Sequence, residues 1–177
     1  PIISTDSRQF YRNMAIGTAQ PTAEELSAAT HYFIADRDVD DDFNCGRYET
    51  EALALLDRLF AEYRYVVAVG GSGLYIQALC NGMDTLPEAD ESLRTELKQR
   101  FATEGLESLV EQLRTLDPRY ADQVDVHNPS RVMRALEVCI ATGRPYSEQR
   151  SGRPAERPFN IIKVGTDMPR DILYDRI

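Results

Sequence analysis

The segment 65–74 constrains the fold more than any other part of the sequence. A short apolar run rich in β-branched residues ends at Val69, residues 70–73 read Gly-Gly-Ser-Gly, and helical character resumes at Leu74. Such a run is typical of a strand buried in a parallel sheet, and the glycines at its end predict a tight turn into a helix. The sequence therefore predicts a strand, turn and helix unit of an α/β fold.

Three further segments complete this predicted core. Ile2 and Ile3 precede four polar residues, which indicates a strand that brings polar side chains to its carboxyl edge, where α/β sheets bind ligands. Residues 22–25 have the form of a capping box, and apolar residues at helical spacing predict an amphipathic helix over 49–63. Residues 159–165 alternate in the manner of a strand, so we expect the chain to return to the sheet there.

The middle of the chain has a different pattern. From residue 87 to residue 150, leucine and other apolar residues repeat at helical spacing, which predicts an all-helical insertion. Prolines and glycines over 152–158 indicate a linker. The sequence therefore predicts an α/β core over 1–86, a helical insertion over 87–150, and a return to the core over 151–177.

Composition and charge exclude several classes of protein. The chain of 177 residues is 42% apolar and 28% charged, as in ordinary soluble domains. Its net charge of −9 counts against indiscriminate nucleic-acid binding, although arginines outnumber acidic residues from His127 to Arg157, which indicates a local phosphate-binding surface. The longest uncharged stretch, 65–83, holds four glycines and does not predict a membrane span. Three scattered cysteines favour a reducing compartment, and two isolated histidines give no zinc site.

Three features could carry chemistry, and each has a plainer interpretation. Asp6 follows a predicted strand, where its carboxylate could accept a proton or could simply cap a turn. The glycine turn and Ser72 offer amides and a hydroxyl to an anion or nucleobase, or form only a tight turn. Arg131 and Arg134 share one helix face, where they could bind phosphate or form salt bridges in solvent.

Four motifs in order give the sequence a specific resemblance. They read ISTDSRQFY at 3–11, IGTAQPT at 16–22, GGSGLY at 70–75 and NPSRVMRALE at 128–137. Together they resemble the bacterial tRNA dimethylallyltransferase family. The resemblance implies a P-loop-NTPase-like parallel sheet core, of a nucleotide-binding and ATP-binding type, with a helical insertion. It also implies an enzyme that moves a dimethylallyl group from its diphosphate to the exocyclic amine of the adenosine 3′-adjacent to the anticodon.

The same resemblance implies roles for individual residues and for partners. Asp6 corresponds to the general base, and Ser72 stands where the family usually has Thr but keeps a catalytic hydroxyl. Gly71 and Ser72 would bind diphosphate, magnesium would be the cofactor with no metal ligand among these residues, and the protein would be a cytoplasmic monomer without a membrane segment. The implied partners are the tRNA anticodon stem-loop and dimethylallyl diphosphate. The residues implied to contact tRNA are Asp6, Ser7, Arg8, Gln9, Ser72, Arg94, Ser130, Arg131, Val132, Met133 and Arg134.

One family feature is not found among these residues, and two alternatives stay open. The glycine-rich GPTxSGKT loop is absent, so we expect the isolated chain to be inactive and to self-associate through an uncovered edge of the strand at Ile2 and Ile3. An adenylate prenyltransferase acting on free nucleotides would use Asp6 and the glycine turn equally well, but the helical insertion and the arginines favour tRNA. A catalytically silent RNA-binding fragment is the other alternative.

Overall fold

The computed structural model describes residues 1–84, 86–87, 90–150, 152 and 154–176. The chain forms two compact units, one from residues 1–82 with 154–177 and one from residues 83–153. The predicted insertion, 87–150, lies within the second unit. Residue 151, where the predicted return to the core begins, lies outside the described residues. We describe each unit by itself.

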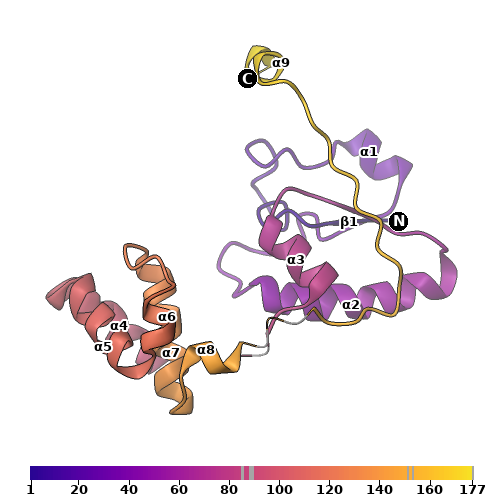
Figure 1. Cartoon of the computed structure of the whole chain (residues 1–177). Coiled ribbons are helices and arrows are strands. Elements are labelled where there is room, and N and C mark those ends of the chain that lie inside the picture. Colours follow the sequence, from indigo (N-terminus) through magenta and orange to yellow (C-terminus); the bar gives the residue numbers. More distant parts are fainter. Residues whose placement is uncertain (85, 88–89, 151, 153, 177) are drawn as a thin grey trace. The chain divides into compact units, whose positions relative to one another are not determined.

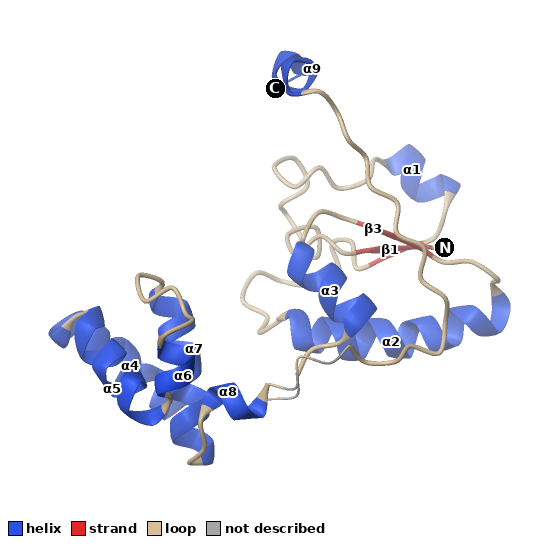
Figure 2. Cartoon of the chain, in the orientation of Figure 1, coloured by secondary structure: helices blue, strands red, loops and turns tan. Residues whose placement is uncertain are grey.

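A parallel sheet organises the first unit (Figures 1 and 2). Its strands are β1 (Ile2–Ser4), β2 (His31–Tyr32) and β3 (Val67–Val69), in the spatial order β2-β1-β3. Both pairings are parallel, so the carboxyl ends of all three strands lie at one edge of the sheet. The predicted α/β fold class is therefore confirmed.

Helices α1 (Ala23–Ala28), α2 (Cys45–Glu62) and α3 (Gly73–Asn81) complete this unit. The predicted capping box begins α1, since the side chains of Thr22 and Glu25 each accept a hydrogen bond from the other's backbone amide. Helix α2 begins four residues before its predicted start, because the Asn44 side chain accepts hydrogen bonds from the amides of Gly46 and Arg47. Its apolar face joins Ile3 and Phe10 in one core; the buried residues on that face are Tyr48, Ala52, Leu55, Leu56 and Leu59.

Three details of the predicted sheet are wrong. Strand β3 is not buried, because Val67 and Val69 are each more than half exposed. Residues 159–165 form no strand, since a strand needs a hydrogen-bonded neighbour and the described sheet ends at β3. Finally, the edge strands of the described sheet are β2 and β3, whereas β1, expected to have lost a neighbour, is paired on both sides.

The chain leaves and re-enters the first unit at one point beside the end of α3. The amide of Ala155 donates to the carbonyl of Asn81 at 2.6 Å. The buried guanidinium of Arg157 donates to the carbonyls of Ala78 and Leu79 at 2.7 and 3.0 Å, and pairs with Glu49 at 2.6 Å. The segment returning from the second unit is thus fixed directly against the segment that departs.

The second unit is helical, and among its described residues there is no strand. Its helices are α4 (Glu91–Glu104), α5 (Leu106–Leu116), α6 (Pro118–Ala121), α7 (Pro129–Thr142) and α8 (Tyr146–Gln149). They enclose a core of their own, which includes Leu97, Leu109, Leu113, Val132 and Leu136. A separate short helix, α9 (Arg170–Arg176), lies near the C-terminus in the first unit and buries no residue.

Within the described part of the chain, no helix combines the length and the apolar character that crossing a bilayer requires.

Candidate active site and RNA-contact surface

The ends of β1 and β3 bring two predicted segments together. Because these strands are parallel neighbours, the polar residues after β1 and the glycine turn after β3 meet at the same edge. The Thr5 amide donates to the Val69 carbonyl at 2.7 Å. The Ser72 hydroxyl accepts from the Ser7 amide at 2.9 Å and lies 3.0 Å from the Ser7 hydroxyl, to which it donates. The structure thus joins residues that are 65 positions apart in the sequence.

Gly70 allows this close approach. A Cβ atom at this position would lie 2.4 Å from Oγ1 of Thr5 and 2.6 Å from the backbone nitrogen of Asp6. Backbone atoms cannot yield as a flexible side chain can, so any larger residue would push the Asp6 segment away. Gly71 differs from Gly70, since a Cβ atom there would meet nothing within 4 Å. Sequence reasoning identified the turn but did not distinguish these two glycines.

The Asp6 carboxylate uses one oxygen to accept a hydrogen bond within a turn and leaves its second oxygen available. Its Oδ1 accepts from the Arg8 amide at 2.9 Å, and its own amide donates to the Ser4 hydroxyl at 3.2 Å. Among the described residues, Oδ2 has no hydrogen-bond donor, and the side chain is partly exposed. The two interpretations of Asp6 are therefore compatible, because one oxygen fixes the turn while the other can accept a proton.

Gln9 uses its side chain inside the protein. Its Nε2 donates to the carbonyls of Thr18 and Ala19 at 3.1 and 2.9 Å, and its Oε1 accepts from the Ser4 hydroxyl at 2.9 Å. These bonds use both amide hydrogens, so Gln9 anchors the loop that contains Thr18 and Ala19. The neighbouring Arg8 is exposed and its side chain is accessible from solvent.

Tyr48 holds the end of β1 in place from the buried side, and the sequence analysis did not identify it. Its hydroxyl donates to the Ser4 carbonyl at 3.0 Å, and its ring stacks on Phe10 with 5.5 Å between centroids. Burial raises the pKa of Tyr48 above its ordinary value, so the hydroxyl stays protonated and remains a donor. Tyr48 lies one residue before the predicted helix start, and correct recognition of the Asn44 cap would have placed it on the buried face.

Helix α7 presents some of the predicted RNA contacts and buries another. Ser130 and Arg131 are exposed in its first turn. Val132 is fully buried in the helical core, so its predicted contact with tRNA is wrong for the side chain. The α-helical period explains this result, because Val132 lies on the same helix face as Ala135 and Leu136, which pack in the core. Met133 is partly buried and packs against the same core.

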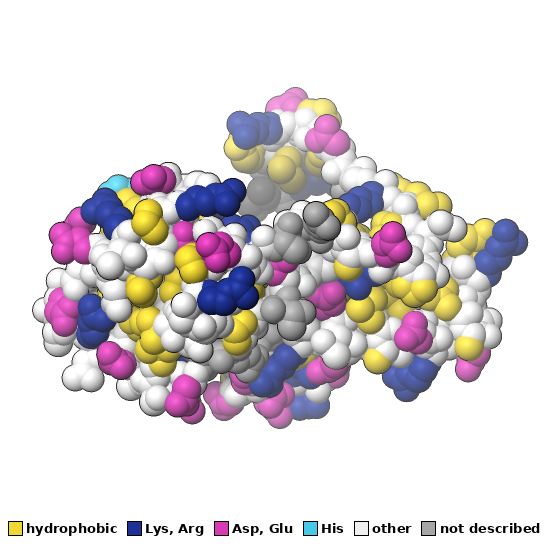
Figure 3. Space-filling view, turned by 60° about the horizontal axis from the view of Figure 1, so that its bottom comes forward, with side chains coloured by type: hydrophobic (Ala, Val, Ile, Leu, Met, Phe, Trp, Pro, Cys, Tyr) yellow, Lys and Arg dark blue, Asp and Glu magenta, His cyan; other side chains and the backbone are white. Residues whose placement is uncertain are grey.

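Arg94 and Arg134 meet at one acidic residue. Arg94 Nε of α4 lies 3.8 Å from Oε1 of Glu137, and Arg134 Nη1 of α7 lies 3.1 Å from Oε2. On the face drawn in Figure 3, cationic and anionic side chains alternate and do not form one broad basic patch. Arg94 and Arg134 therefore lie beside an acidic neighbour.

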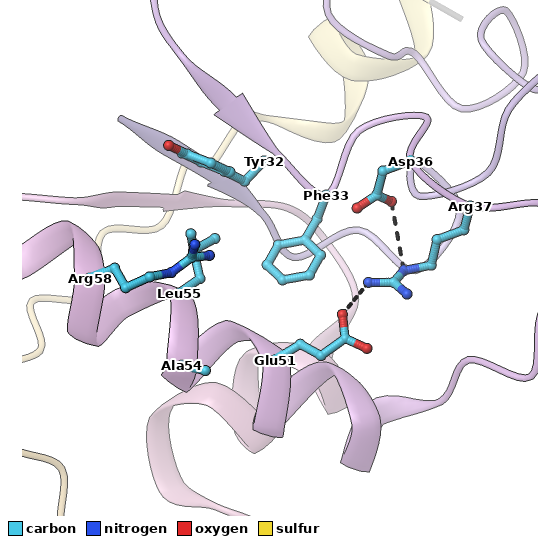
Figure 4. Close-up of a pocket in the computed structure, with 8 residues that line it drawn as sticks. All are labelled: Tyr32, Phe33, Asp36, Arg37, Glu51, Ala54, Leu55 and Arg58. Atoms are coloured by element: carbon cyan, nitrogen blue, oxygen red, sulfur yellow. Dashed lines mark hydrogen bonds and ion pairs between the residues drawn. The ribbon is translucent and has the colours of Figure 1, made fainter.

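A separate hollow of about 340 Å³ lies between β2, the loop after it, and α2 (Figure 4). Arg37 is its central charged group and forms ion pairs with Asp36, at 3.7 Å, and with Glu51. The Arg37 guanidinium also lies over the Phe43 ring, 3.7 Å from its centroid. Burial raises the pKa of Asp36. This hollow contains none of the predicted site residues, and Arg37 is paired with acidic residues of the protein itself.

The fold and the site together define an α/β protein that gathers a carboxylate and two hydroxyls at the carboxyl edge of a parallel sheet and carries arginines on a helical unit. The sequence profile described as IPP transferase matches residues 9–177. The chain belongs to this family.

Relatives with known names agree with this assignment. The chain is 46% identical over 177 residues to tRNA dimethylallyltransferase 2 of Azobacteroides pseudotrichonymphae, covering all of this chain and 58% of the relative. It is 44% identical over 176 residues to tRNA dimethylallyltransferase 1 of Bacteroides fragilis, covering 99% of this chain and 58% of the relative. The chain thus spans somewhat more than half the length of these relatives.

Solved structures resemble the chain as well. The tRNA isopentenylpyrophosphate transferase of Bacillus halodurans matches with a TM-score of 0.57 and 35% identity, over 99% of this chain and 54% of that one. A eukaryotic dimethylallyltransferase acting on tRNA matches with a TM-score of 0.70 and 22% identity, over 86% of this chain and 39% of that one. The second likeness concerns the fold alone.

Proposed function

We propose that the whole protein containing this chain transfers a dimethylallyl group from dimethylallyl diphosphate to the exocyclic amine of the adenosine 3′-adjacent to the anticodon in tRNA. The observation that carries the proposal is the meeting of Asp6, Ser7 and Ser72 at the carboxyl ends of two neighbouring parallel strands. Membership in the IPP transferase family and relatives named tRNA dimethylallyltransferase support the same reaction.

Asp6 would act as the general base. The adenosine nitrogen forms a bond to the first carbon of the dimethylallyl group, and the bond from that carbon to the diphosphate oxygen breaks. The diphosphate leaves with the electron pair, and the carboxylate of Asp6 takes the proton that the nitrogen loses. The oxygen bonded to Arg8 fixes the turn, which leaves Oδ2 for the proton.

Ser72 would hold the reacting segments in place, and the open turn would accept the diphosphate. The Ser72 hydroxyl joins the two strand ends through Ser7, so it fixes Asp6 relative to the glycine turn. Open space at Gly71 lets an anion approach the backbone amides near the start of α3. We therefore propose a mainly positioning role for Ser72 within the catalytic site.

The tRNA would contact both the strand-end site and the helical unit. Ser7 and Arg8 follow Asp6 directly, which suits contacts to the nucleotides beside the reacting adenosine. Ser130, Arg131, Arg134 and Arg94 would bind backbone phosphates, because guanidinium groups match phosphate geometry. Gln9 would act through the loop that it anchors.

Magnesium is the proposed cofactor of the whole protein. Among the residues that the structure describes, no group of three or more His, Cys, Asp or Glu side chains could hold a metal ion. Mg²⁺ commonly binds one or two carboxylates together with substrate phosphates, and it would supply positive charge to the departing diphosphate. None of the steps above depends on the ion.

We further propose that the whole protein is a cytoplasmic monomer with a nucleotide-binding core of the ATP-binding type. This proposal extends the family resemblance.

Prenyl transfer from radiolabelled dimethylallyl diphosphate to an unmodified anticodon stem-loop tests the function. We expect transfer by the whole protein to the stem-loop, and none to a stem-loop with guanosine at the acceptor position. Free adenosine monophosphate, offered in a parallel reaction, tests the adenylate alternative. Transfer to the free nucleotide in preference to the stem-loop, or binding without transfer to either acceptor, would contradict the proposal.

A further inference from the structure

Glu137 holds two arginines from different helices on its two oxygens. Arg94 of α4 approaches Oε1 at 3.8 Å, and Arg134 of α7 approaches Oε2 at 3.1 Å. Arg134 also donates through Nη2 to the Pro87 carbonyl at 3.4 Å. Glu137 is the most buried of the three ionic side chains, at 14% exposure, while Arg94 and Arg134 are 40% and 36% exposed. The carboxylate therefore lies beneath two partly exposed guanidinium groups.

The triad formed by Arg94, Glu137 and Arg134 does not carry the charge of two free cations. Two guanidinium groups and one carboxylate leave one net positive charge, and the shared carboxylate brings both cations to the same place on the surface. A polyanion that approaches meets a single net charge carried by two partly exposed guanidinium groups, which are rich in N–H donors. The release of counterions follows the number of phosphates neutralised, so the triad should count as one contact.

Resting on the proposed function, we propose that Arg94, Glu137 and Arg134 form one composite site for a single phosphate of the RNA backbone. Glu137 is a positioning residue, because it orients the two arginines and sets the net charge of the site. The site differs in this respect from Arg131, which lies exposed in the first turn of α7 and would make a contact of its own. It also differs from an ordinary neutral ion pair, which leaves no net charge for phosphate.

The composite site predicts a non-additive effect of substitution. Arg94→Gln leaves the neutral pair of Arg134 and Glu137, and Arg134→Gln leaves the neutral pair of Arg94 and Glu137. Either single substitution in the whole protein should therefore lower the slope of log affinity against log salt by about 0.7 to 0.9, the value of one phosphate contact. The double substitution should lower the slope by the same amount, since only one contact is present to lose. Glu137→Gln no longer holds the two arginines at one phosphate, so each can contact a phosphate of its own and the slope should increase by up to about the same amount.

A second ion pair in the same unit provides a matched control. Arg114 of α5 pairs with Glu107 at 3.4 Å, and its side chain is 56% exposed. Arg114→Gln makes the same charge change as the test variants but removes no part of the triad, so the salt slope should not change. Thermal unfolding of every variant establishes that the helical unit is folded during the binding measurements.

Binding of the anticodon stem-loop is measured from 50 to 300 mM salt, with prenyl transfer followed for the same samples. Equal slopes for both single variants and the double variant, each about one contact below the wild type, support the composite site. A double variant that loses twice as much as each single variant overturns it, because the arginines are then independent contacts. Unchanged slopes in all three also overturn it. Wild-type protein without transfer would overturn the proposed function itself, whereas transfer with additive slopes overturns only this inference.

Discussion

The strand-end site and the arginine surface of the helical unit are held by different kinds of force. At the strand ends, Asp6, Ser7 and Ser72 are fixed by backbone pairing and by hydrogen bonds to backbone amides. On the helical unit, Arg94 and Arg134 are oriented by a carboxylate on a partly exposed surface. Backbone pairing fixes atoms closely and depends little on salt, whereas exposed ion pairs are weak and screened.

This difference matches the two tasks that we propose. Bond formation at a nitrogen requires close alignment of the reacting atoms, which a sheet edge can supply. Contact with RNA phosphates tolerates looser geometry, because the attraction acts at a distance and each phosphate resembles the next. Substitutions at the strand ends should therefore change turnover, and substitutions on the helical unit should change the salt dependence of binding.

The largest effect should come from the proposed base. Asp6→Asn keeps an oxygen that can accept from the Arg8 amide but removes the proton acceptor, so turnover by the whole protein should fall about 10² to 10⁴-fold. Affinity for the stem-loop should stay within about threefold, since the turn is preserved. Single-turnover prenyl transfer and binding titrations measure the two quantities separately. Wild-type turnover in this variant would remove Asp6 from the mechanism.

The two adjacent glycines give a sharper comparison within the same turn. Gly70→Ala places a Cβ against the backbone of Asp6 and should lower turnover about 10²-fold, with a loss of stability of about 1 to 3 kcal/mol. Gly71→Ala meets open space and is the matched control for stability alone, since it should fold as stably as the wild type but adds a methyl group to the turn proposed to accept the diphosphate. Thermal melts and transfer assays on both variants measure the contrast. Equal stability of the two variants would show that the close approach at Gly70 is unimportant.

Removing the Ser72 hydroxyl should lower turnover moderately, and a threonine at this position should restore it. Ser72→Ala removes both bonds to Ser7, and we expect turnover to fall about 3- to 10-fold, the value of a neutral hydrogen bond. Ser72→Thr keeps the hydroxyl and should stay close to the wild type. Transfer rates at saturating substrate test the pair, and a Thr variant as impaired as the Ala variant would argue against the hydroxyl.

Replacing Arg131 should weaken RNA binding but leave turnover unchanged. Its replacement by Gln removes one exposed cation, so the salt slope of stem-loop binding should fall by about 0.7 to 0.9, with turnover at saturation unaltered. Fluorescence titrations at several salt concentrations measure the slope. A fall in saturated turnover at constant slope would contradict the division of tasks between the two regions.

The smallest effect belongs to the cap of α1. Hydrogen bonds from Thr22 lower the pKa of Glu25, so the cap stabilises the helix at pH values above the ordinary Glu pKa and loses this effect as pH falls through the lowered pKa. Thr22→Ala should reduce this pH dependence and the hydrogen-exchange protection of α1, with no change in transfer. Altered turnover would connect α1 to the site in a way that its hydrogen bonds do not indicate.

Local sequence patterns predicted most of the framework. The Thr22 capping box, the strand at Ile2 and Ile3, and the strand and glycine turn before Leu74 all depend on neighbours in the chain, so their signals lie in short windows. The sequence predicted Asp6 and the glycine turn separately, and their meeting depends on β1 and β3 being parallel neighbours in the sheet.

The remaining features depend on contacts between distant residues. The apolar alternation of 159–165 indicated a strand, but a strand forms only beside a partner, and the described sheet offers none there. Val132 has an apolar side chain between predicted contacts, and only the packing of α7 shows that it faces the core. The pairing of Glu137 with Arg94 could not be read from the sequence, because it depends on the packing of α4 against α7.

The junction at Asn81 and Ala155 has a consequence for how such a protein could be remodelled. Because the departing and returning backbones are hydrogen-bonded neighbours, the 73 residues between them form a closed excursion whose ends already meet. Replacing those residues by a short glycine-containing turn should change the stability of the first unit little, because closing a short loop between two adjacent ends costs little chain entropy. The same geometry would let one helical unit be exchanged for another in evolution, which would change the RNA contacts that we propose and leave the proposed strand-end site as it is.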